Sequence, residues 1–426
     1  MKIGAPTGTA AFLVSGSTLH TMLKFPIKTF VKKEVAPLSG ISLKHLQTEF
    51  EKVELIVIDE KSMIGLYMLY MIDARLKEIK CCNESFGGIS IIIMGDFAQL
   101  PPVKDQPMFA RGTKTRKLSH YQSEAVALFN LFQTTIIFDE IMRQSGDDQK
   151  EFRDTLDSLA SGSFNKEHWN YLKKRSLYDN GNFSPEEQDK FLLEAIMLCA
   201  YKKDMKEYNV QRMKALGTPI AGIKSINSSS ETAKANSSVA QGLLSQMIIA
   251  KNAHVMLISN LWTEAGLTNG ATGEIKYIIY EKGKQPPSLP SMIILQVPQY
   301  TGPSYLNHIS HCIPMTPVTR TWYMDGKTCS RTMLAIAPAY AITIHKSQGM
   351  SLDKVIINIG NSEFANGLTY TAISRCRKIE NLAFYPFENY RRFAVIFRKS
   401  IFKERLCNDL KEKVSDEKTR KSMAKK

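Results

Sequence analysis

Two strand-like runs in the first third of the chain constrain the fold more than any other feature. Residues 53–58 (VELIVI) and 89–94 (ISIIIM) are mostly aliphatic and do not alternate with polar residues. Such runs are typical of strands buried on both faces of a parallel sheet. Between them, residues 66–80 carry apolar side chains at helical spacing. The order strand, helix, strand predicts an α/β fold.

Acidic residues follow both runs. Asp59 and Glu60 come directly after the first, and Asp96 comes shortly after the second. Ligands of open α/β sheets bind beyond the carboxyl ends of the strands, where these carboxylates would lie. We therefore interpret them as placed for a metal or phosphate ligand.

The middle of the chain predicts a second α/β unit. Ser184, Pro185 and Glu187 form a helix start with a serine cap, a proline at the first position and a glutamate at the third. A strand is expected at 195–200 and a helix at 203–216. The α/β pattern then stops and returns only from residue 333 onward.

A β-rich insert is expected to interrupt this second unit. Residues 225–238 are rich in Ser, Asn and Ala, which predicts a flexible connection, and short β-like runs follow at 254–258, 274–280 and 292–297. The expected domains are 1–145, then 146–224 with 333–400, an insert at 225–332, and a basic, disordered tail at 401–426.

Charge and composition narrow the partners. The chain has 56 Lys and Arg against 41 Asp and Glu, a net charge of +15, which favours a polyanion, most simply nucleic acid. No apolar stretch approaches the roughly 20 residues that cross a bilayer. The seven cysteines are scattered without CxxC spacing, as in proteins of a reducing compartment with mostly buried thiols.

Two segments have the chemistry of phosphoryl transfer. In LIVIDEKSM, Asp59 could hold Mg²⁺ and Glu60 could orient an attacking water. In IIIMGDFAQLPPV, Gln99 lies on a proline-stiffened loop from which it could sense a γ-phosphate. The alternatives are a plain helix start for the first segment and a plain turn for the second.

Two further segments suit a nucleic-acid backbone. In ITIHKSQG, Thr343, His345, Lys346 and Ser347 supply donors before a glycine, although an isolated HKSQG is also compatible with a surface loop.

Near the start of the chain, APTGTAA and STLH place Thr7, Thr18 and His20 where they could contact phosphates. Small residues such as Gly8 would let a strand approach the backbone. In YTAISRCR, Arg375 could stabilise transition-state charge on a nucleotide, or could simply form a surface ion pair.

In this order, the segments resemble the Pif-type (petite-integration-frequency) DNA helicases of the RecD-like branch of helicase superfamily one. APTGTAA with STLH looks like motif Ia, IDEKSM like Walker B, GDFAQLPPV like motif III, FDEIMRQ like motif IV, ITIHKSQG like motif V and YTAISRCR like motif VI.

The resemblance implies two RecA-like parallel-sheet domains, the first incomplete, with a small SH3-like β-barrel insert in the second. It implies an ATP-dependent 5′–3′ DNA helicase of genome or telomere maintenance, repair and recombination, which uses ATP and Mg²⁺ on single-stranded and forked DNA in the nucleus or mitochondrion.

The resemblance also assigns roles to residues. Asp59 would bind Mg²⁺, Glu60 would be the catalytic base, and Gln99 would sense the γ-phosphate. Arg143 and Arg375 would act as arginine fingers, with Gln144 and Gly349 beside the nucleotide. DNA contacts would come from Thr7, Gly8, Thr18, His20, Thr343, His345, Lys346 and Ser347.

One departure is the P-loop, because no GxxxxGK[ST] occurs in the chain and motif Ia begins at the fifth residue. We expect an N-terminally truncated helicase with impaired ATP hydrolysis. The alternative is a non-catalytic single-stranded-DNA-binding remnant, derived from a mobile element. A smaller departure is Lys61, where the family commonly has an apolar residue.

A separate hypothesis is a metal site at His308, His311 and Cys312, whose spacing allows the three side chains to converge. The alternative is a hairpin with incidental histidines.

Overall fold

The computed structural model describes residues 1–25, 37–38, 40–110, 118–134, 136, 138, 141–178, 182–235, 237, 239–262, 265–324 and 327–394. The chain divides into two compact units, Met1–Ala200 with Ile344–Lys426, and Tyr201–Thr343. The second unit is therefore wider than the insert expected at 225–332. The predicted tail at 401–426 lies outside the described residues. No helix in the described ranges is both long and apolar enough to cross a membrane.

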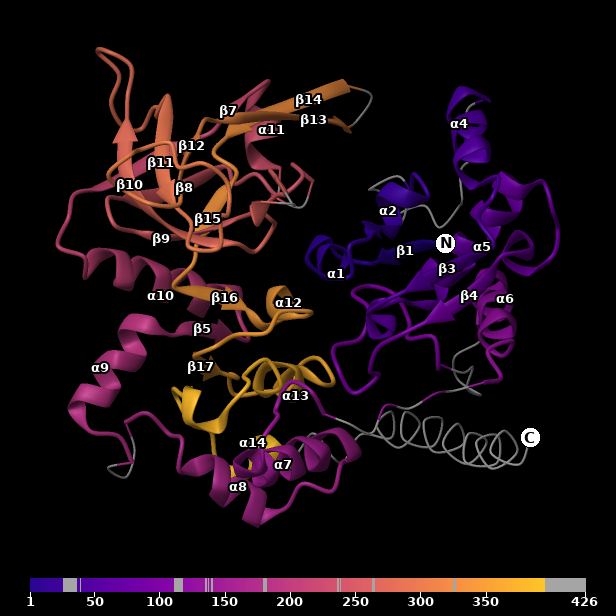
Figure 1. Ribbon diagram of the computed structural model, residues 1–426, viewed down its shortest axis with the longest axis horizontal. Helices are drawn as coiled ribbons and strands as arrows, with labels where there is room; N and C mark the ends of the chain where they lie inside the picture. Colours follow the sequence, from indigo (N-terminus) through magenta and orange to yellow (C-terminus); the bar gives the residue numbers. More distant parts are fainter. Residues whose placement is uncertain are drawn as a thin grey trace. The chain divides into compact units, whose positions relative to one another are not determined.

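The first unit begins with a parallel sheet whose strand order is β2-β1-β3-β4 (Figure 1). The predicted strands are confirmed as β3 and β4, and Ile58 pairs with Ile93 at their carboxyl ends. The strands are β1 (Lys2–Ala5), β2 (Ser17–Thr18), β3 (Leu55–Ile58) and β4 (Ser90–Ile93).

Burial on both faces was wrong for β4. Ile92 is 48% exposed and Met94 is 41% exposed. The strand lies at the edge of the sheet, where neighbouring elements leave part of this aliphatic run exposed.

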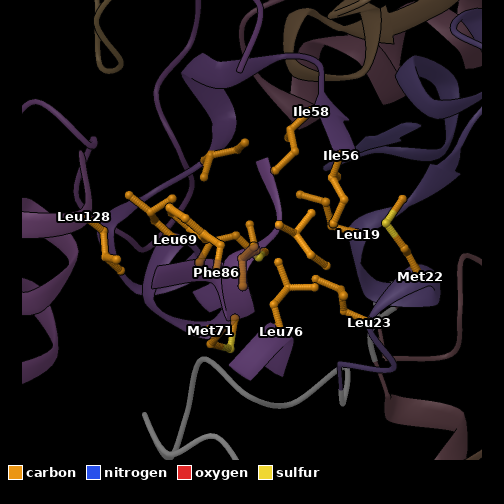
Figure 2. Close-up of a cluster of buried hydrophobic side chains, with 14 of the residues drawn as sticks. Leu19, Met22, Leu23, Ile56, Ile58, Leu69, Met71, Leu76, Phe86 and Leu128 are labelled. Atoms are coloured by element: carbon orange, nitrogen blue, oxygen red, sulfur yellow. The ribbon is translucent and has the colours of Figure 1, made fainter. Parts of the chain in front are cut away.

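One hydrophobic cluster joins this sheet to its helices. Figure 2 shows Leu19, Ile56, Leu76 and Phe86 among the gathered side chains, which come from a short helix, a strand, a long helix and a short 3₁₀ helix. Full burial of each such side chain contributes about 1.5–3 kcal/mol. The helices of this region are α1 (Gly8–Leu13), α2 (Leu19–Met22), α4 (Gly40–Phe50), α5 (Leu66–Lys80) and α6 (His120–Phe129).

The same unit holds a second parallel arrangement in which β17 pairs with β5 on one side and β18 on the other. The predicted capping box is present, since Glu187 N donates to Ser184 Oγ at 3.2 Å and Ser184 N donates to Glu187 Oε2 at 2.8 Å. The elements are α7 (Lys150–Ser161), α8 (Lys166–Lys173), α9 (Pro185–Glu194), β5 (Ile196–Cys199), α12 (Ile344–Ser347), β17 (Val355–Asn358), α13 (Leu368–Ile373), β18 (Leu382–Phe384) and α14 (Tyr390–Ala394).

The second unit is β-rich. Its largest sheet has the order β12-β11-β10-β9-β15 and is antiparallel throughout. The elements are α10 (Lys202–Lys214), β6 (Ile220–Lys224), β7 (Ile226–Asn227), α11 (Ser230–Lys234), β8 (Gln246–Ala250), β9 (His254–Leu257), β10 (Thr272–Ile279), β11 (Met292–Gln296), β12 (Cys312–Met315), β13 (Val318–Met324), β14 (Lys327–Met333), β15 (Ile336–Pro338) and β16 (Ala341–Thr343).

The flexible connection expected at 225–238 was wrong, because β7 and α11 lie within it. Ser229 caps α11 by accepting from Thr232 N at 3.1 Å. Arg331, about a hundred residues later, donates to Thr232 O at 2.8 Å and Ala235 O at 2.9 Å. These distant contacts order a segment whose composition alone resembles a linker.

The six cysteines of the described ranges are free thiols. Four of them are buried, as the sequence predicted: Cys199, Cys312, Cys329 and Cys376.

Candidate functional site

Glu60 follows β3 in a strained conformation. Its φ of 55° and ψ of 52° are left-handed, which is uncommon for a residue with a side chain. Lys61 N donates to Met94 O at 2.7 Å, and a Cβ on Gly95 would lie only 2.7 Å from Lys61 N. The close approach of the two strand ends thus fixes this backbone. Residues held in sparsely populated backbone regions cluster at functional sites.

The Glu60 side chain is 9% exposed and accepts a hydrogen bond from Gln348 Nε2 at 3.1 Å. Burial raises the pKa of Glu60, while Gln348, Arg375 and Arg143 partly oppose this rise. A carboxylate with a raised pKa suits proton abstraction near neutral pH.

The positive charge of Arg375 interacts with the negative charge of Glu60. This guanidinium is 1% exposed, and its Nη2 donates to Gln99 Oε1 at 3.2 Å. Burial, and then the charge of Arg143, lower the pKa of Arg375 to about 10. Two guanidiniums that disfavour each other in a low-dielectric site favour an anionic ligand. The predicted residues Glu60, Gln99, Arg143 and Arg375 therefore share one cluster.

Arg143 and Gln144 hold the segment that ends α13. Arg143 donates to Ser351 Oγ at 3.0 Å and to Ser374 O at 3.2 Å. The buried Gln144 amide donates to Ser374 O at 3.3 Å and Cys376 O at 2.7 Å. Its amide hydrogens are thus engaged by main-chain oxygens, and its contact with a nucleotide stays a prediction.

Residues that sequence reasoning missed lock the loop after β4 onto α13. Gly367 has a φ of +80°, and a Cβ there would collide with Ala98 O. Leu100 N donates to Thr371 Oγ1 at 3.2 Å. Tyr370 forms a hydrogen bond with Asp96, and desolvation raises its pKa. Some lie inside the quoted motifs, but no local pattern names a partner about 270 residues away.

The predicted DNA residues near the start serve local structure. Thr7 Oγ1 accepts from Ala10 N at 3.3 Å near the start of α1, which Gly8 begins. Thr18 caps α2 by accepting from Thr21 N at 3.1 Å. His20 packs edge-on against Phe25, and burial lowers its pKa. Their DNA contacts stay predictions.

The HKSQG segment divides between exposed and buried positions. Lys346 is exposed, and the half-buried His345 is stacked with the 51% exposed Phe364. An exposed aromatic face near a cation is typical of single-stranded nucleic-acid sites. Ser347 is fully buried and donates to Ile344 O at 2.8 Å, so the predicted DNA contact would require it to become exposed.

Thr343 and Gly349, two further predicted residues, have different surroundings. Thr343 is 7% exposed at the end of the second unit, and its DNA contact stays a prediction. Gly349 has a φ of +81°, and a Cβ there would lie 3.6 Å from Glu60 Oε1. The chain around Gly349 therefore lies directly against the Glu60 carboxylate.

The metal hypothesis for His308, His311 and Cys312 was wrong. No group of three His, Cys, Asp or Glu side chains in the described ranges is arranged to hold a metal. His311 Nδ1 instead lies 2.6 Å from Tyr300 O, and Cys312 is buried in the sheet.

With this geometry established, the chain can be compared with known proteins. A family model for PIF1-like helicases matches residues 3–170. The ATP-dependent DNA helicase PIF1 of Danio rerio is 29% identical over 420 residues, covering 94% of this chain and 57% of the relative. The chain is therefore similar to the PIF1-like helicases over most of its length.

Other PIF1-like relatives agree. PIF1 of Xenopus laevis is 30% identical, with 90% of this chain and 54% of the relative covered. Pif1 of Campylobacter jejuni is 27% identical, and the match covers 88% of this chain and 80% of the relative. The chain thus spans little more than half the length of the vertebrate relatives.

Solved Pif1 structures share the fold. The Pif1 helicase of Candida albicans has a TM-score of 0.66 at 22% identity, covering 93% of this chain and 88% of that one. A Bacteroides Pif1 bound to ssDNA has a TM-score of 0.61 at 23% identity, with 94% and 85% covered. These likenesses confirm the predicted RecA-like α/β architecture.

Proposed function

We propose that this chain is the motor part of an ATP-dependent DNA helicase that couples ATP hydrolysis to 5′–3′ movement on single-stranded DNA and to duplex unwinding. The observation that carries the proposal is the cluster of Glu60, Gln99, Arg143 and Arg375. It joins a desolvated carboxylate to two guanidiniums through residues far apart in sequence.

The donor set fits a nucleoside triphosphate. The phosphate charge would relieve the unfavourable proximity of Arg143 and Arg375, which already lowers the pKa of Arg375. Glu60 would accept a proton from the attacking water, and Gln99, held at 3.2 Å by Arg375, would orient the terminal phosphate.

Asp59 would hold Mg²⁺. It directly follows β3 and its side chain is half-buried, beside the carboxylate of Glu60. Magnesium is usually held by one or two carboxylates together with substrate phosphates, so a single protein carboxylate fits. When bound, Mg²⁺ would neutralise charge that develops on the phosphates.

Support for the DNA substrate comes from charge and from relatives. The chain has a net charge of +15, and Lys346 is exposed beside His345. Related structures include a Bacteroides Pif1 bound to ssDNA and Pif1 helicases at forked dsDNA. We propose the same two DNA forms as partners here.

Hydrolysis and DNA binding test the proposal separately. We expect ssDNA-stimulated ATP hydrolysis to be lost in Glu60→Gln but kept in Glu54→Gln, an exposed carboxylate on the same segment. We expect Lys346→Ala to weaken ssDNA binding and to lower its salt slope by about 1, whereas the exposed Lys166→Ala should change neither. Salt-independent binding would contradict the proposal.

A second candidate is single-stranded DNA binding without turnover. It is favoured by the absence of GxxxxGK[ST] from these 426 residues, because that loop supplies the main phosphate-binding groups. Salt-sensitive ssDNA binding without any ssDNA-stimulated hydrolysis would select this candidate. Hydrolysis that depends on Glu60 would exclude it.

A further inference from the structure

Gln348 is a buried bridge between two segments that the sequence separates by almost three hundred residues. Its Nε2 donates to Glu60 Oε2 at 3.1 Å and to Ser62 Oγ at 3.0 Å. Gln348 and Ser62 are each 3% exposed. Both amide hydrogens are therefore used, and water does not compete for them.

Gln348 lies next to the segments that are expected to hold DNA. It comes two residues after the exposed Lys346 and one residue after α12 ends. Gly349 then turns with a φ of +81°, and a Cβ there would lie 3.6 Å from Glu60 Oε1 and 3.7 Å from Ala10 Cα. Ala10 belongs to α1, which follows Thr7. Both segments expected to hold DNA thus meet at Gly349, which lies against Glu60.

Glu60 itself cannot adjust freely. Its left-handed backbone is fixed by the bond from Lys61 N to Met94 O and by the tight packing of Gly95. A displacement of α12 would therefore strain the hydrogen bond between Gln348 and the Glu60 carboxylate.

We propose that Gln348 is a positioning residue that couples ssDNA binding at α12 to the placement of the Glu60 carboxylate. This inference rests on the proposed function and adds its regulation by DNA. If the bridge transmits this coupling, a variant that breaks the hydrogen bond between Gln348 and Glu60 should change ssDNA affinity. No nucleotide and no turnover are needed to see this effect.

An exchange of the two groups tests the bridge. Gln348→Glu places a second carboxylate against Glu60, and we expect it to weaken ssDNA binding about fivefold. Glu60→Gln alone keeps an acceptor for Gln348, and its measured affinity is the reference for the double variant. The double variant Glu60→Gln with Gln348→Glu restores an amide–carboxylate pair and should recover most of the affinity.

The measurement is fluorescence anisotropy of a labelled oligothymidine without nucleotide, with the full 426-residue chain. Gln348→Met, which has similar length but no amide, controls for the added charge and should also weaken binding. Thermal unfolding of each variant, followed by circular dichroism, controls for folding. A bridge that only supported the fold would change the melting temperature and leave the affinity of the folded protein unchanged.

The outcomes separate the two proposals. If the wild type binds ssDNA and the double variant rescues Gln348→Glu, the coupling is supported. If the wild type binds and every Gln348 variant binds equally well, or if the double variant fails to rescue, the coupling is overturned while the proposed function stands. If the wild type shows no salt-sensitive ssDNA binding, the proposed function fails first.

Discussion

Arg331 in the second unit and Arg375 in the first are both deeply buried, and the two are surrounded differently. In the second unit, Arg331 is fully buried and donates to Asn227 Oδ1 and to the carbonyl oxygens of Leu243, Thr232, Ala233 and Ala235. In the first unit, Arg375 is as deeply buried, but it lies close to another guanidinium and to a carboxylate.

The difference fits a structural role for Arg331 and the phosphate-binding role that we propose for Arg375. Arg331 is held by neutral oxygens of one segment, including the last carbonyls of α11, where positive charge is favourable. Arg375 has the unfavourable neighbour Arg143 in a desolvated site, an arrangement that an anion would relieve.

The largest expected effect is on the stability of the second unit. Arg331→Met should lower the free energy of unfolding by at least about 3 kcal/mol, because each bond from a charged donor contributes about 1.5–3 kcal/mol and buried carbonyls would lose their donor. Urea denaturation followed by circular dichroism measures this. Lys327→Met, which removes an exposed cation from the same strand, should change it little.

Two glycines provide a matched pair across the units. Gly367 in the first unit and Gly266 in the second have φ values of +80° and +82°, and a Cβ on either would collide with a carbonyl oxygen. Each change to Ala should cost about 2–3 kcal/mol in the free energy of unfolding. Only Gly367→Ala should also reduce ATP-dependent stabilisation, because it separates the Gln99 loop from α13. If ATP stabilised Gly367→Ala and Gly266→Ala equally, the proposed difference between the two units would be contradicted.

Anion binding should distinguish the two arginines. At a tenfold excess over Kd, ATP should stabilise the wild type by about 1.4 kcal/mol, measured as a rise in melting temperature. Arg375→Met should lose this rise, whereas Arg391→Met, an exposed control on α14, should keep it. An undiminished rise in Arg375→Met would show that the cluster does not hold the phosphates.

The smallest effect concerns pH. Burial raises the pKa of Glu60, so the folded state binds more protons than the unfolded state between the ordinary glutamate value and the raised one. The stability that Glu60 contributes is present at low pH and is lost as pH rises through this window. The Gln side chain of Glu60→Gln does not titrate, so this variant does not lose that stability as pH rises. Its free energy of unfolding relative to the wild type should therefore increase between pH 4 and pH 7. A constant difference would contradict the raised pKa.

Local patterns predicted the elements that local physics dominates. The helix at 66–80 and the capping box at Ser184 follow from periodicity and short-range hydrogen bonds, and both are present with the expected residues. The order within β7 and α11 could not be predicted, because it depends on Arg331 about a hundred residues away. The exposure of Ile92 likewise depends on β4 being an edge strand.

For the site, residue type and position made Asp59, Glu60, Gln99 and Arg375 candidates, and the family resemblance added Arg143. The sequence by itself determined elements such as the helix at 66–80, the positive charge and these candidates. Only the tertiary structure decided that Glu60 is strained and desolvated, that Arg375 holds Gln99, and that Gln348 spans the two segments. The reason is physical: burial and hydrogen bonding between residues hundreds of positions apart depend on how the chain folds back, which no local pattern encodes.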